Sequence, residues 1–226
     1  MGSRAILFIV SGPSGSGKTT LVEHLLRKLP NTMFSVSYTT RAPRAGEQNG
    51  REYHFVSRAE FEAMSQRGEF LEQARVFDDS YGTHRSYLEQ AQQEGKDLIL
   101  DIDVQGAAQV KALQPDAVSV FVLPPSCEDL KQRLRARGVD AVPVIERRLE
   151  FARREIREID AYDYVVINDE LARACAAVEA IAQAEQWARR DGAASTAGET
   201  LAAQYRREAQ RERVSAILES FGMQTR

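Results

Sequence analysis

A glycine-rich segment near the start of the chain has the residue types needed to bind a phosphate chain. Residues 12–19 read Gly-Pro-Ser-Gly-Ser-Gly-Lys-Thr, which is the P-loop spacing G-x-x-x-x-G-K-[ST]. Glycines let the backbone N–H groups face an anion, and the N-terminus of a following helix adds partial positive charge. Lys18 can reach the outer phosphates of a nucleotide, and the Thr19 hydroxyl suits Mg²⁺. The alternative is a glycine-rich turn that joins a strand to a helix, with a solvated lysine.

The elements on either side of this segment favour the phosphate-binding interpretation. An uninterrupted apolar run over residues 5–10 precedes it, which is typical of a buried parallel strand. Residues 20–29 follow with apolar side chains on one helical face, and Pro30 ends the pattern. The order strand, glycine-rich turn and helix is the context that a P-loop requires.

The remaining apolar runs predict an α/β fold. We expect strands at residues 97–103, 118–123 and 164–168, with helical patterns between them, and hence a parallel sheet covered on both faces. Short β-like runs at residues 34–38, 53–56 and 70–77, with a short helix at 60–67, predict instead a small mixed β lobe inserted into the larger fold.

Composition limits the classes of protein to consider. A chain of 226 residues forms one domain, or one core with inserted lobes, and its net charge of −3 gives no basic field for nucleic acid or membrane. Cys127 and Cys175 lie far apart, as expected of buried thiols in a reducing compartment. The first apolar run is the P-loop strand, so we expect no signal peptide and a cytoplasmic location.

An arginine-rich stretch at residues 128–159 has two interpretations. Between residues 131 and 157 there are nine basic and four acidic side chains, and the sequence around Gly138 and Pro143 predicts two helices joined by a mobile loop. These charges could form a solvated helix surface with i,i+4 pairs. We favour a lid that closes arginines over phosphates, because the chain already carries a P-loop.

The C-terminal part of the chain shows no arrangement of catalytic residue types. Residues 172–190 predict an alanine-rich helix, and residues 192–198 a flexible linker. Residues 199–221 predict one amphipathic helix, which could dock on the domain or on a second subunit as a homo-oligomer.

A second cluster of basic residues is suited to a phosphate monoester. Arg41 and Arg44 stand three apart, with Tyr53 within reach, although an exposed basic loop would look the same. The whole segment reads S-x-T-T-R-x-P-R-x-G-E-x-x-G-x-x-Y and here resembles the guanylate kinases, whose nucleoside-monophosphate segment it matches position for position. Further matches to that family follow in order at Glu72 and at residues 81–83, 101–106, 133–138 and 168–169, so that the resemblance covers residues 4–190.

The resemblance implies a P-loop nucleoside-monophosphate kinase fold and Mg²⁺-dependent transfer of phosphate from ATP to GMP. It implies ATP binding by Gly12, Pro13, Ser14, Gly15, Ser16, Gly17, Lys18, Thr19 and Thr20, with Asn168 near the adenine. It implies GMP binding by Ser37, Arg41, Arg44, Glu47, Tyr53, Glu72, Tyr81, Thr83 and Asp103. Lys18, Arg135, Arg137 and Arg148 would carry the catalytic charge, and Thr19 and Asp101 would hold the metal.

The same resemblance implies a division of the chain. The P-loop core would take residues 4–33 and 96–190, with the lid at about 128–159, and the GMP lobe residues 34–95. Residues 191–226, the linker and C-terminal helix, lie outside what the family implies.

These implied roles agree with the chemistry of guanine. Its N1–H and N2–H₂ groups donate hydrogen bonds that Glu72 and Asp103 could accept, whereas adenine would leave both carboxylates unpaired. The acceptor phosphate is already an anion, so no dedicated base is needed, and none of His24, His54 and His84 falls in a matched position.

Two alternatives remain open at this point. The chain could be a P-loop kinase for AMP, dTMP or a non-nucleotide acceptor, and use of dGMP is undecided. It could also be a guanylate-kinase-like module that binds proteins and has lost catalysis, although the intact Gly17-Lys18-Thr19 sequence favours an enzyme.

Overall fold

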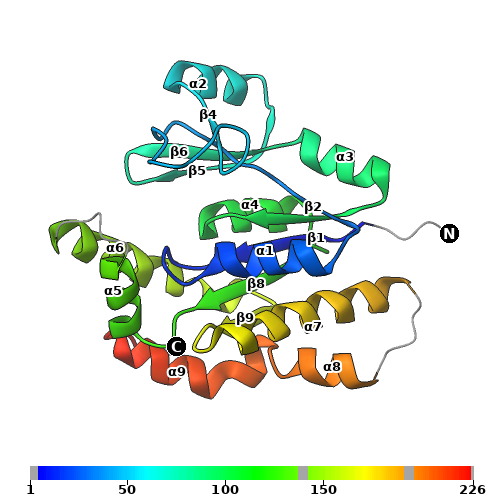
Figure 1. Ribbon diagram of the computed structural model, residues 1–226, viewed down its shortest axis with the longest axis vertical. Coiled ribbons are helices and arrows are strands. Elements are labelled where there is room, and N and C mark those ends of the chain that lie inside the picture. The colour runs from blue at the N-terminus through cyan, green and yellow to red at the C-terminus, as the bar shows by residue number, and fades with distance from the viewer. Residues whose placement is uncertain (1–4, 137–141, 191–195, 225–226) are drawn as a thin grey trace. The chain divides into compact units, whose positions relative to one another are not determined.

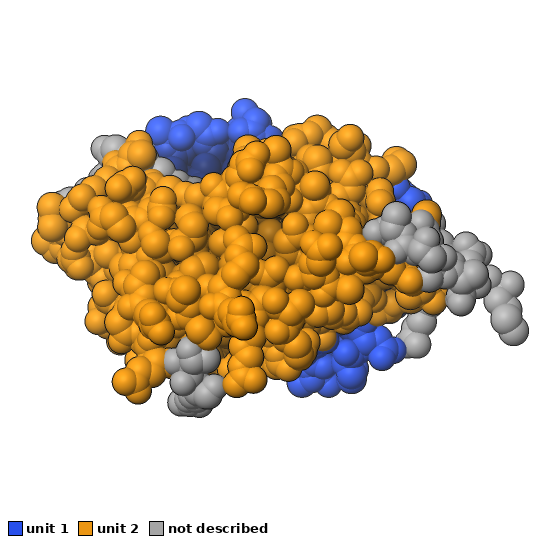
Figure 2. Space-filling view, turned by 90° about the horizontal axis from the view of Figure 1, so that it is seen from below, with its two compact units in different colours: residues 1–9, 31–117 blue, residues 10–30, 118–226 orange. Residues whose placement is uncertain are grey.

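The computed structural model describes residues 5–136, 142–190 and 196–224, and Figure 1 labels its elements. The chain divides into two compact units, which Figure 2 colours separately. Unit 1 comprises residues 1–9 and 31–117, and unit 2 comprises residues 10–30 and 118–226. The division falls within the first strand, and each unit is described by itself.

The larger sheet has five strands in the order β2-β7-β1-β8-β9. Their bounds are Thr32–Phe34, Asp97–Asp101, Leu7–Ser11, Val118–Leu123 and Tyr164–Ile167. β2 pairs in parallel with β7 in unit 1, and β8 pairs in parallel with β9 in unit 2. Every residue of β1, β8 and β9 is buried, as expected of parallel strands with apolar sequences. The predicted α/β fold class is therefore confirmed.

Unit 1 also contains a smaller mixed sheet in the order β4-β3-β6-β5. The bounds of β3, β4, β5 and β6 are Tyr38–Thr39, His54–Phe55, Phe70–Val76 and Asp79–His84. β3 runs parallel to β4 and antiparallel to β6, which forms a hairpin with β5. The predicted short helix is α2 (Arg58–Gln66). Ser57 caps it, because the Ser57 side chain accepts a hydrogen bond from the Glu60 N–H. Phe61 and Met64 of this helix pack on Phe70 of the sheet.

One expectation for this part of the chain was wrong, and one strand was not predicted. The run at residues 34–38 is not one strand, because Phe34 ends β2 in the larger sheet and Tyr38 begins β3 in the smaller one. β6 was missed because its polar sequence, Asp-Ser-Tyr-Gly-Thr-His, has no apolar run. Pairing with β5 makes it a strand, and local sequence does not report that pairing. Unit 1 is completed by α3 (Ser86–Glu94) and α4 (Val104–Leu113).

The helices of unit 2 follow the predicted pattern up to residue 190. α1 (Lys18–Lys28) follows the P-loop and contacts α7 (Leu171–Arg190). The arginine-rich stretch forms two helices, as expected, namely α5 (Cys127–Ala136) and α6 (Val142–Ile156). The predicted loop between them, at residues 137–141, lies outside the described residues.

The C-terminal region differs from the prediction of a linker and one helix. α8 (Thr196–Ala203) already begins within the predicted linker, and α9 (Arg211–Ser220) forms a separate helix after the short turn η2 (Arg207–Gln210). Between α8 and η2, the Tyr205 carbonyl accepts the Val165 N–H at 2.8 Å, so the chain runs along the outer edge of β9. An edge strand offers unpaired backbone groups, and pairing with them interrupts the helix. The C-terminal segment was expected to dock either on the domain or on a second subunit. In the structure it docks on the domain, because η2 contacts β9 and α9 contacts α5 (Figure 1).

Within the described ranges, no helix has both the length and the apolar character needed to cross a bilayer.

Candidate active site

The P-loop in unit 2 has a backbone that only glycine adopts easily. Gly12, Gly15 and Gly17 have φ angles of 136°, 95° and 97°. A Cβ atom on Gly12 would overlap the carbonyl oxygen of Val122, and one on Gly17 would overlap the side-chain amide of Asn168. The spacing of the glycines is thus required both by backbone conformation and by close approach to neighbouring strands.

The Lys18 side chain lies back across the loop that precedes it. Its Nζ donates to the carbonyl oxygens of Gly12 at 2.6 Å and Pro13 at 3.4 Å. The Pro13 carbonyl also accepts the Ser16 N–H at 3.0 Å, which closes the turn. Ser14, Thr19 and Thr20 are exposed, whereas Ser16 is buried. The ammonium group and two hydroxyls of the first helical turn are therefore placed at the anion-binding end of α1.

Two side chains from elsewhere in unit 2 hold the carbonyl oxygen of Ser16. The Nδ2 of Asn168, at the end of β9, donates to it at 2.7 Å. Arg133, on α5, donates to the same oxygen from Nη1 at 3.4 Å and to the Asn168 carbonyl from Nη2 at 2.7 Å. We expected Asn168 near the adenine, and Arg133 had no assigned role although it lies in a matched segment. Both residues support the phosphate loop directly.

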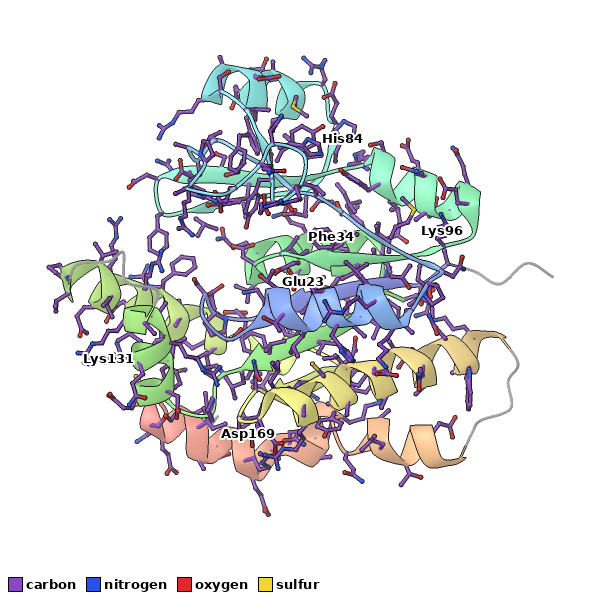
Figure 3. The ribbon with its side chains drawn as sticks, in the orientation of Figure 1. Glu23, Phe34, His84, Lys96, Lys131 and Asp169 are labelled. Atoms are coloured by element: carbon purple, nitrogen blue, oxygen red, sulfur yellow. The ribbon has the colours of Figure 1, made fainter. Side chains whose placement is uncertain are left out.

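The remaining arginines predicted for catalysis lie on the arginine-rich helices. Arg135 is exposed on α5 and Arg148 is half-buried on α6, while Arg137 lies outside the described residues. The two helices are joined by an ion pair between Lys131, labelled in Figure 3, and Glu146 at 3.4 Å.

In unit 1, five of the residues predicted to bind GMP form one connected group next to or within β3, β4 and β6. Arg41 donates to both carboxylate oxygens of Glu47, at 2.9 and 3.0 Å, and its guanidinium carbon lies 5.3 Å from the centre of the Tyr53 ring. The Tyr53 and Tyr81 rings are 5.8 Å apart. Arg44 is exposed, and its backbone N–H donates to Glu47 at 2.6 Å. Glu47 thus fixes the position of Arg41 and the backbone of Arg44.

Ionisation in this group is set by burial and by neighbouring charges. Burial alone would raise the pKa of the Glu47 carboxyl, but hydrogen bonds from Arg41 and Arg44 hold that pKa below its usual value. Burial, reinforced by the negative charge of Asp101, raises the pKa of Tyr53 to about 12. The Tyr53 hydroxyl therefore remains protonated and can donate a hydrogen bond at neutral pH.

A buried carboxylate, Glu72, lies at the other group of predicted GMP residues. Its side chain is only 4% exposed, and β5 pairs it with Thr83 of β6. Burial raises the pKa of Glu72 to about 7, and the charge of Asp103 adds to this, while the nearby Thr83 opposes it. A Cβ on Gly106 would overlap Glu72, so the start of α4 approaches the carboxylate closely because residue 106 is glycine.

Asp103 has a structural role that the sequence did not reveal. It is the residue before α4, and its Oδ1 accepts the Gly106 N–H at 2.9 Å, while its Oδ2 accepts from the Gln105 side chain at 2.9 Å. The fourth predicted base-reading residue, Ser37, is buried just before β3. Its carbonyl accepts the His54 N–H at 2.9 Å, which links two strands of the small sheet.

The two predicted metal ligands belong to different units. Thr19 is exposed in the first turn of α1, and Asp101 is the half-buried last residue of β7. The described part of the chain holds no group of three or more histidine, cysteine or acidic side chains that could enclose a metal. One hydroxyl and one carboxylate are the few protein donors expected for Mg²⁺, which is usually held by substrate phosphates and water as well.

Comparison with known proteins identifies the family of this chain. The guanylate kinase family model matches residues 4–185. The chain is 52% identical to the guanylate kinase of Dechloromonas aromatica (strain RCB) over 178 residues, which cover 79% of this chain and 88% of that protein. The chain belongs to the guanylate kinase family. It is also 50% identical over 180 residues to the guanylate kinase of Nitrosomonas europaea, covering 80% of this chain and 90% of that one.

A solved structure agrees with this assignment. The crystal structure of guanylate kinase from Anaplasma phagocytophilum aligns with a TM-score of 0.66 and 36% identity, over 82% of this chain and 87% of that one. All of the candidate site residues lie inside the stretch matched by the guanylate kinase family model, whereas α8, η2 and α9 lie beyond it.

A cavity of about 680 Å³ in unit 2 lies away from these residues. Its lining comes from α6, η1 (Ile159–Ala161), β9 and the C-terminal segment, and it includes Val165, Val214 and Leu218. None of the candidate site residues within the described ranges lines it, so we do not assign it to either substrate.

Proposed function

We propose that the protein transfers the γ-phosphoryl group of ATP to GMP, forming ADP and GDP. The observation that carries this proposal is the buried carboxylate of Glu72, with Asp103 beside it, in a guanylate kinase family chain whose P-loop is complete. A buried acid is costly unless a donor satisfies it, and guanine supplies donors that adenine lacks.

The donor site consists of residues 12–20 together with Asn168 and Arg133. The N–H groups of the loop and the Lys18 ammonium would bind the ATP phosphates, replacing the carbonyl contacts that Lys18 makes in this structure. Arg135, Arg137 and Arg148 would neutralise the charge that develops on the transferred group.

The residues present also fit a magnesium ion. Thr19 and Asp101 offer a hydroxyl and a carboxylate, which are the hard oxygen donors that Mg²⁺ prefers. When bound with ATP, Mg²⁺ would neutralise phosphate charge. The Lys18 ammonium would also neutralise phosphate charge, and the N–H groups of the loop would orient the phosphates.

The acceptor phosphate would be bound by four side chains of unit 1. Arg41 and Arg44 provide positive charge, and the hydroxyls of Tyr53 and Tyr81 provide hydrogen bonds. Glu47 would act as a positioning residue, because its bidentate pair with Arg41 sets the direction of the guanidinium group. The acceptor oxygen is an anion near neutral pH, so the chain needs no general base, and alignment and charge neutralisation account for catalysis.

The guanine would be read by Glu72, Asp103, Thr83 and Ser37. The Glu72 carboxylate would accept from guanine N–H groups, and the Thr83 hydroxyl would donate to O6. AMP would leave Glu72 buried without a hydrogen-bond donor, which can reduce the use of AMP as a substrate by ~10⁴-fold.

We place this reaction in the cytoplasm, a compartment that keeps thiols reduced, because Cys127 and Cys175 are both free.

A coupled assay of ADP release tests the proposal. ATP and Mg²⁺ would be supplied with GMP, dGMP, AMP, dTMP or CMP in separate reactions. We expect turnover with guanine monophosphates and at most a trace with the others. Turnover with another base instead would retain the P-loop assignment and refute the guanine site. No turnover with any acceptor, in folded protein, would favour a binding module without catalysis.

A further inference from the structure

We propose that the C-terminal helix α9 positions the donor site, acting through Arg213 on the turn that carries Asn168. The inference rests on the proposed function, because it concerns the affinity for ATP. α9 spans Arg211–Ser220, beyond residue 185 where the family match ends. Its contribution would therefore be particular to chains that carry this segment.

The first contact joins α9 to the residue that follows Asn168. Arg213 donates from Nη2 to the Oδ2 of Asp169 at 2.9 Å, and Arg173 of α7 pairs with the other oxygen at 3.2 Å. Asp169 is labelled in Figure 3, at the turn between β9 and α7. Since Asn168 holds the carbonyl of Ser16 at 2.7 Å, the turn fixed by the two arginines is the one that supports the P-loop.

Two further contacts join the end of α9 to the arginine-rich helices. The Ser220 hydroxyl accepts the backbone N–H of Cys127 at 3.0 Å, and so satisfies one of the N–H groups that the first turn of α5 leaves unpaired. The Phe221 carbonyl accepts from the Nε of Arg153, on α6, at 3.0 Å.

These contacts converge on one atom of the donor site. α5 carries Arg133, which donates to the carbonyl oxygen of Ser16, and the turn after β9 carries Asn168, which donates to the same oxygen. α9 contacts both supports, one through Ser220 and the other through Arg213. Loss of either contact would loosen the P-loop while leaving the residues of unit 1 unchanged.

The expected effect is modest, because the ion pair is partly exposed to water. The Arg213 and Asp169 side chains are 50% and 25% exposed, and pairs of this kind contribute little energy. We therefore expect Arg213→Gln to weaken ATP binding by roughly two- to five-fold.

The test compares Arg213→Gln with Arg211→Gln in the full chain. Both changes remove one positive charge from the same helix, but only Arg213 pairs with Asp169. Each variant would be titrated with a fluorescent non-hydrolysable ATP analogue, and the KM values for ATP and GMP would be measured separately. We expect weaker analogue binding and a higher KM for ATP in Arg213→Gln alone, with the KM for GMP equal in the two variants and their melting temperatures within about 4 °C of each other.

Two more variants exclude a general loss of structure. Arg213→Lys should restore part of the affinity, and Arg213→Gln combined with Asp169→Asn should weaken binding by less than the product of the two separate effects. Equal analogue affinity in Arg213→Gln, Arg211→Gln and the wild type, or independent effects of residues 213 and 169, would overturn the inference. If the wild type binds the analogue but phosphorylates no GMP, the proposed function fails, and the titrations still decide the role of α9.

Discussion

Glu72 is a buried residue whose ionisation bears both on stability and on its predicted role in substrate recognition. Its carboxyl has a pKa of about 7, raised by burial first and by Asp103 second, so near neutral pH it is only partly ionised in the free protein. Hydrogen bonds from guanine would favour the ionised form and lower that pKa. Binding of GMP and ionisation of Glu72 should therefore be coupled.

Glu72→Gln tests this coupling through pH. We expect the KM of the wild type for GMP to rise as the pH falls from about 8 to 6, because Glu72 becomes protonated around its pKa of about 7. The variant should lack this rise and show a higher KM for GMP throughout, with ATP binding little changed. The ratio of the two KM values removes the titration of GMP itself, whose phosphate has a second pKa of about 6. A ratio that does not vary with pH would contradict the role of Glu72.

Glu72→Gln should also remove a pH dependence of stability. Protonation of Glu72 weakens GMP binding but stabilises the folded protein, so the two pH dependences have opposite signs. The pKa of Glu72 is higher in the folded protein than its usual 4.5, so the folded state holds the proton more tightly. The free energy of unfolding of the wild type should therefore fall as the pH rises from about 5 to 8, by about 3 kcal/mol at most, and Glu72→Gln should lack that component. Urea unfolding of both proteins at the two pH values measures it. Parallel changes in the two proteins would show that burial does not raise this pKa.

Lys18 is the residue on which phosphate binding should depend most. Lys18→Ala removes the ammonium group from the P-loop, and we expect turnover to fall by ~10²-fold or more, with the fold retained. The matched control is Lys28→Ala, an exposed lysine at the other end of α1, which should retain normal turnover. Near-normal activity of Lys18→Ala would show that the phosphate site has been misassigned.

At the scale of elements, the start of α4 combines a helix cap with a predicted binding group. Asp103 caps the helix through the Gly106 N–H, and it also contributes charge near Glu72. Asparagine caps a helix about as well as aspartate, but alanine does not, and loss of a cap costs about 1 kcal/mol.

Comparing two substitutions separates these roles of Asp103. Asp103→Asn should change the free energy of unfolding little and still raise the KM for GMP, because the amide cannot replace a carboxylate as an acceptor for two guanine donors. Asp103→Ala should show both the higher KM and the loss of about 1 kcal/mol, measured by urea unfolding. If Asp103→Asn uses GMP normally, Asp103 serves only as a cap.

The P-loop depends on a second element, α5, through Arg133. The carbonyl oxygens of Ser16 and Asn168 are reached by two different nitrogens of the planar Arg133 guanidinium group, and the single ammonium nitrogen of a lysine does not reproduce that forked geometry. We expect Arg133→Lys to raise the KM for ATP about ten-fold, since one net hydrogen bond contributes about 1 kcal/mol and a buried carbonyl would lose its partner. Arg154→Lys, on the exposed face of α6, is the control. Equal KM values for ATP in both variants would refute this support role.

At the scale of the molecule, the two predicted substrate sites draw their residues from different units. The predicted GMP residues all belong to unit 1, and the P-loop, Asn168 and the arginine-rich helices belong to unit 2. Ligands should therefore stabilise separate parts of the chain.

Hydrogen exchange with each ligand alone checks this separation. GMP should slow exchange of backbone amides in β5, β6 and the first turn of α4, and an ATP analogue should slow exchange in residues 12–20 and at the start of α5. The reason is that a bound ligand reduces local opening of the elements that contact it. Protection of the P-loop by GMP alone, without protection of β5 and β6, would contradict the assignment of the sites.

Much of this organisation follows from local sequence. The P-loop needs glycines at fixed spacing, and buried parallel strands need apolar runs, so both features, together with α2 and the two arginine-rich helices, could be predicted. β6 and the C-terminal segment could not, because the first is polar and the second depends on the free edge of β9. Periodicity reports which face of an element is buried, but it does not report which partner buries it.

The sequence by itself determined the chemistry that is available: a phosphate-binding loop, a pair of arginines with tyrosines, two carboxylates, and the family to which the chain belongs. Only the tertiary structure decided that Glu72 is buried enough to have a pKa of about 7, and that Asp103 caps a helix. It also decided that Arg133 and Asn168 meet at Ser16, from positions 117 and 152 residues away along the chain. The physical reason is that residue type and spacing are local properties, whereas burial and hydrogen bonding depend on segments that folding alone brings together.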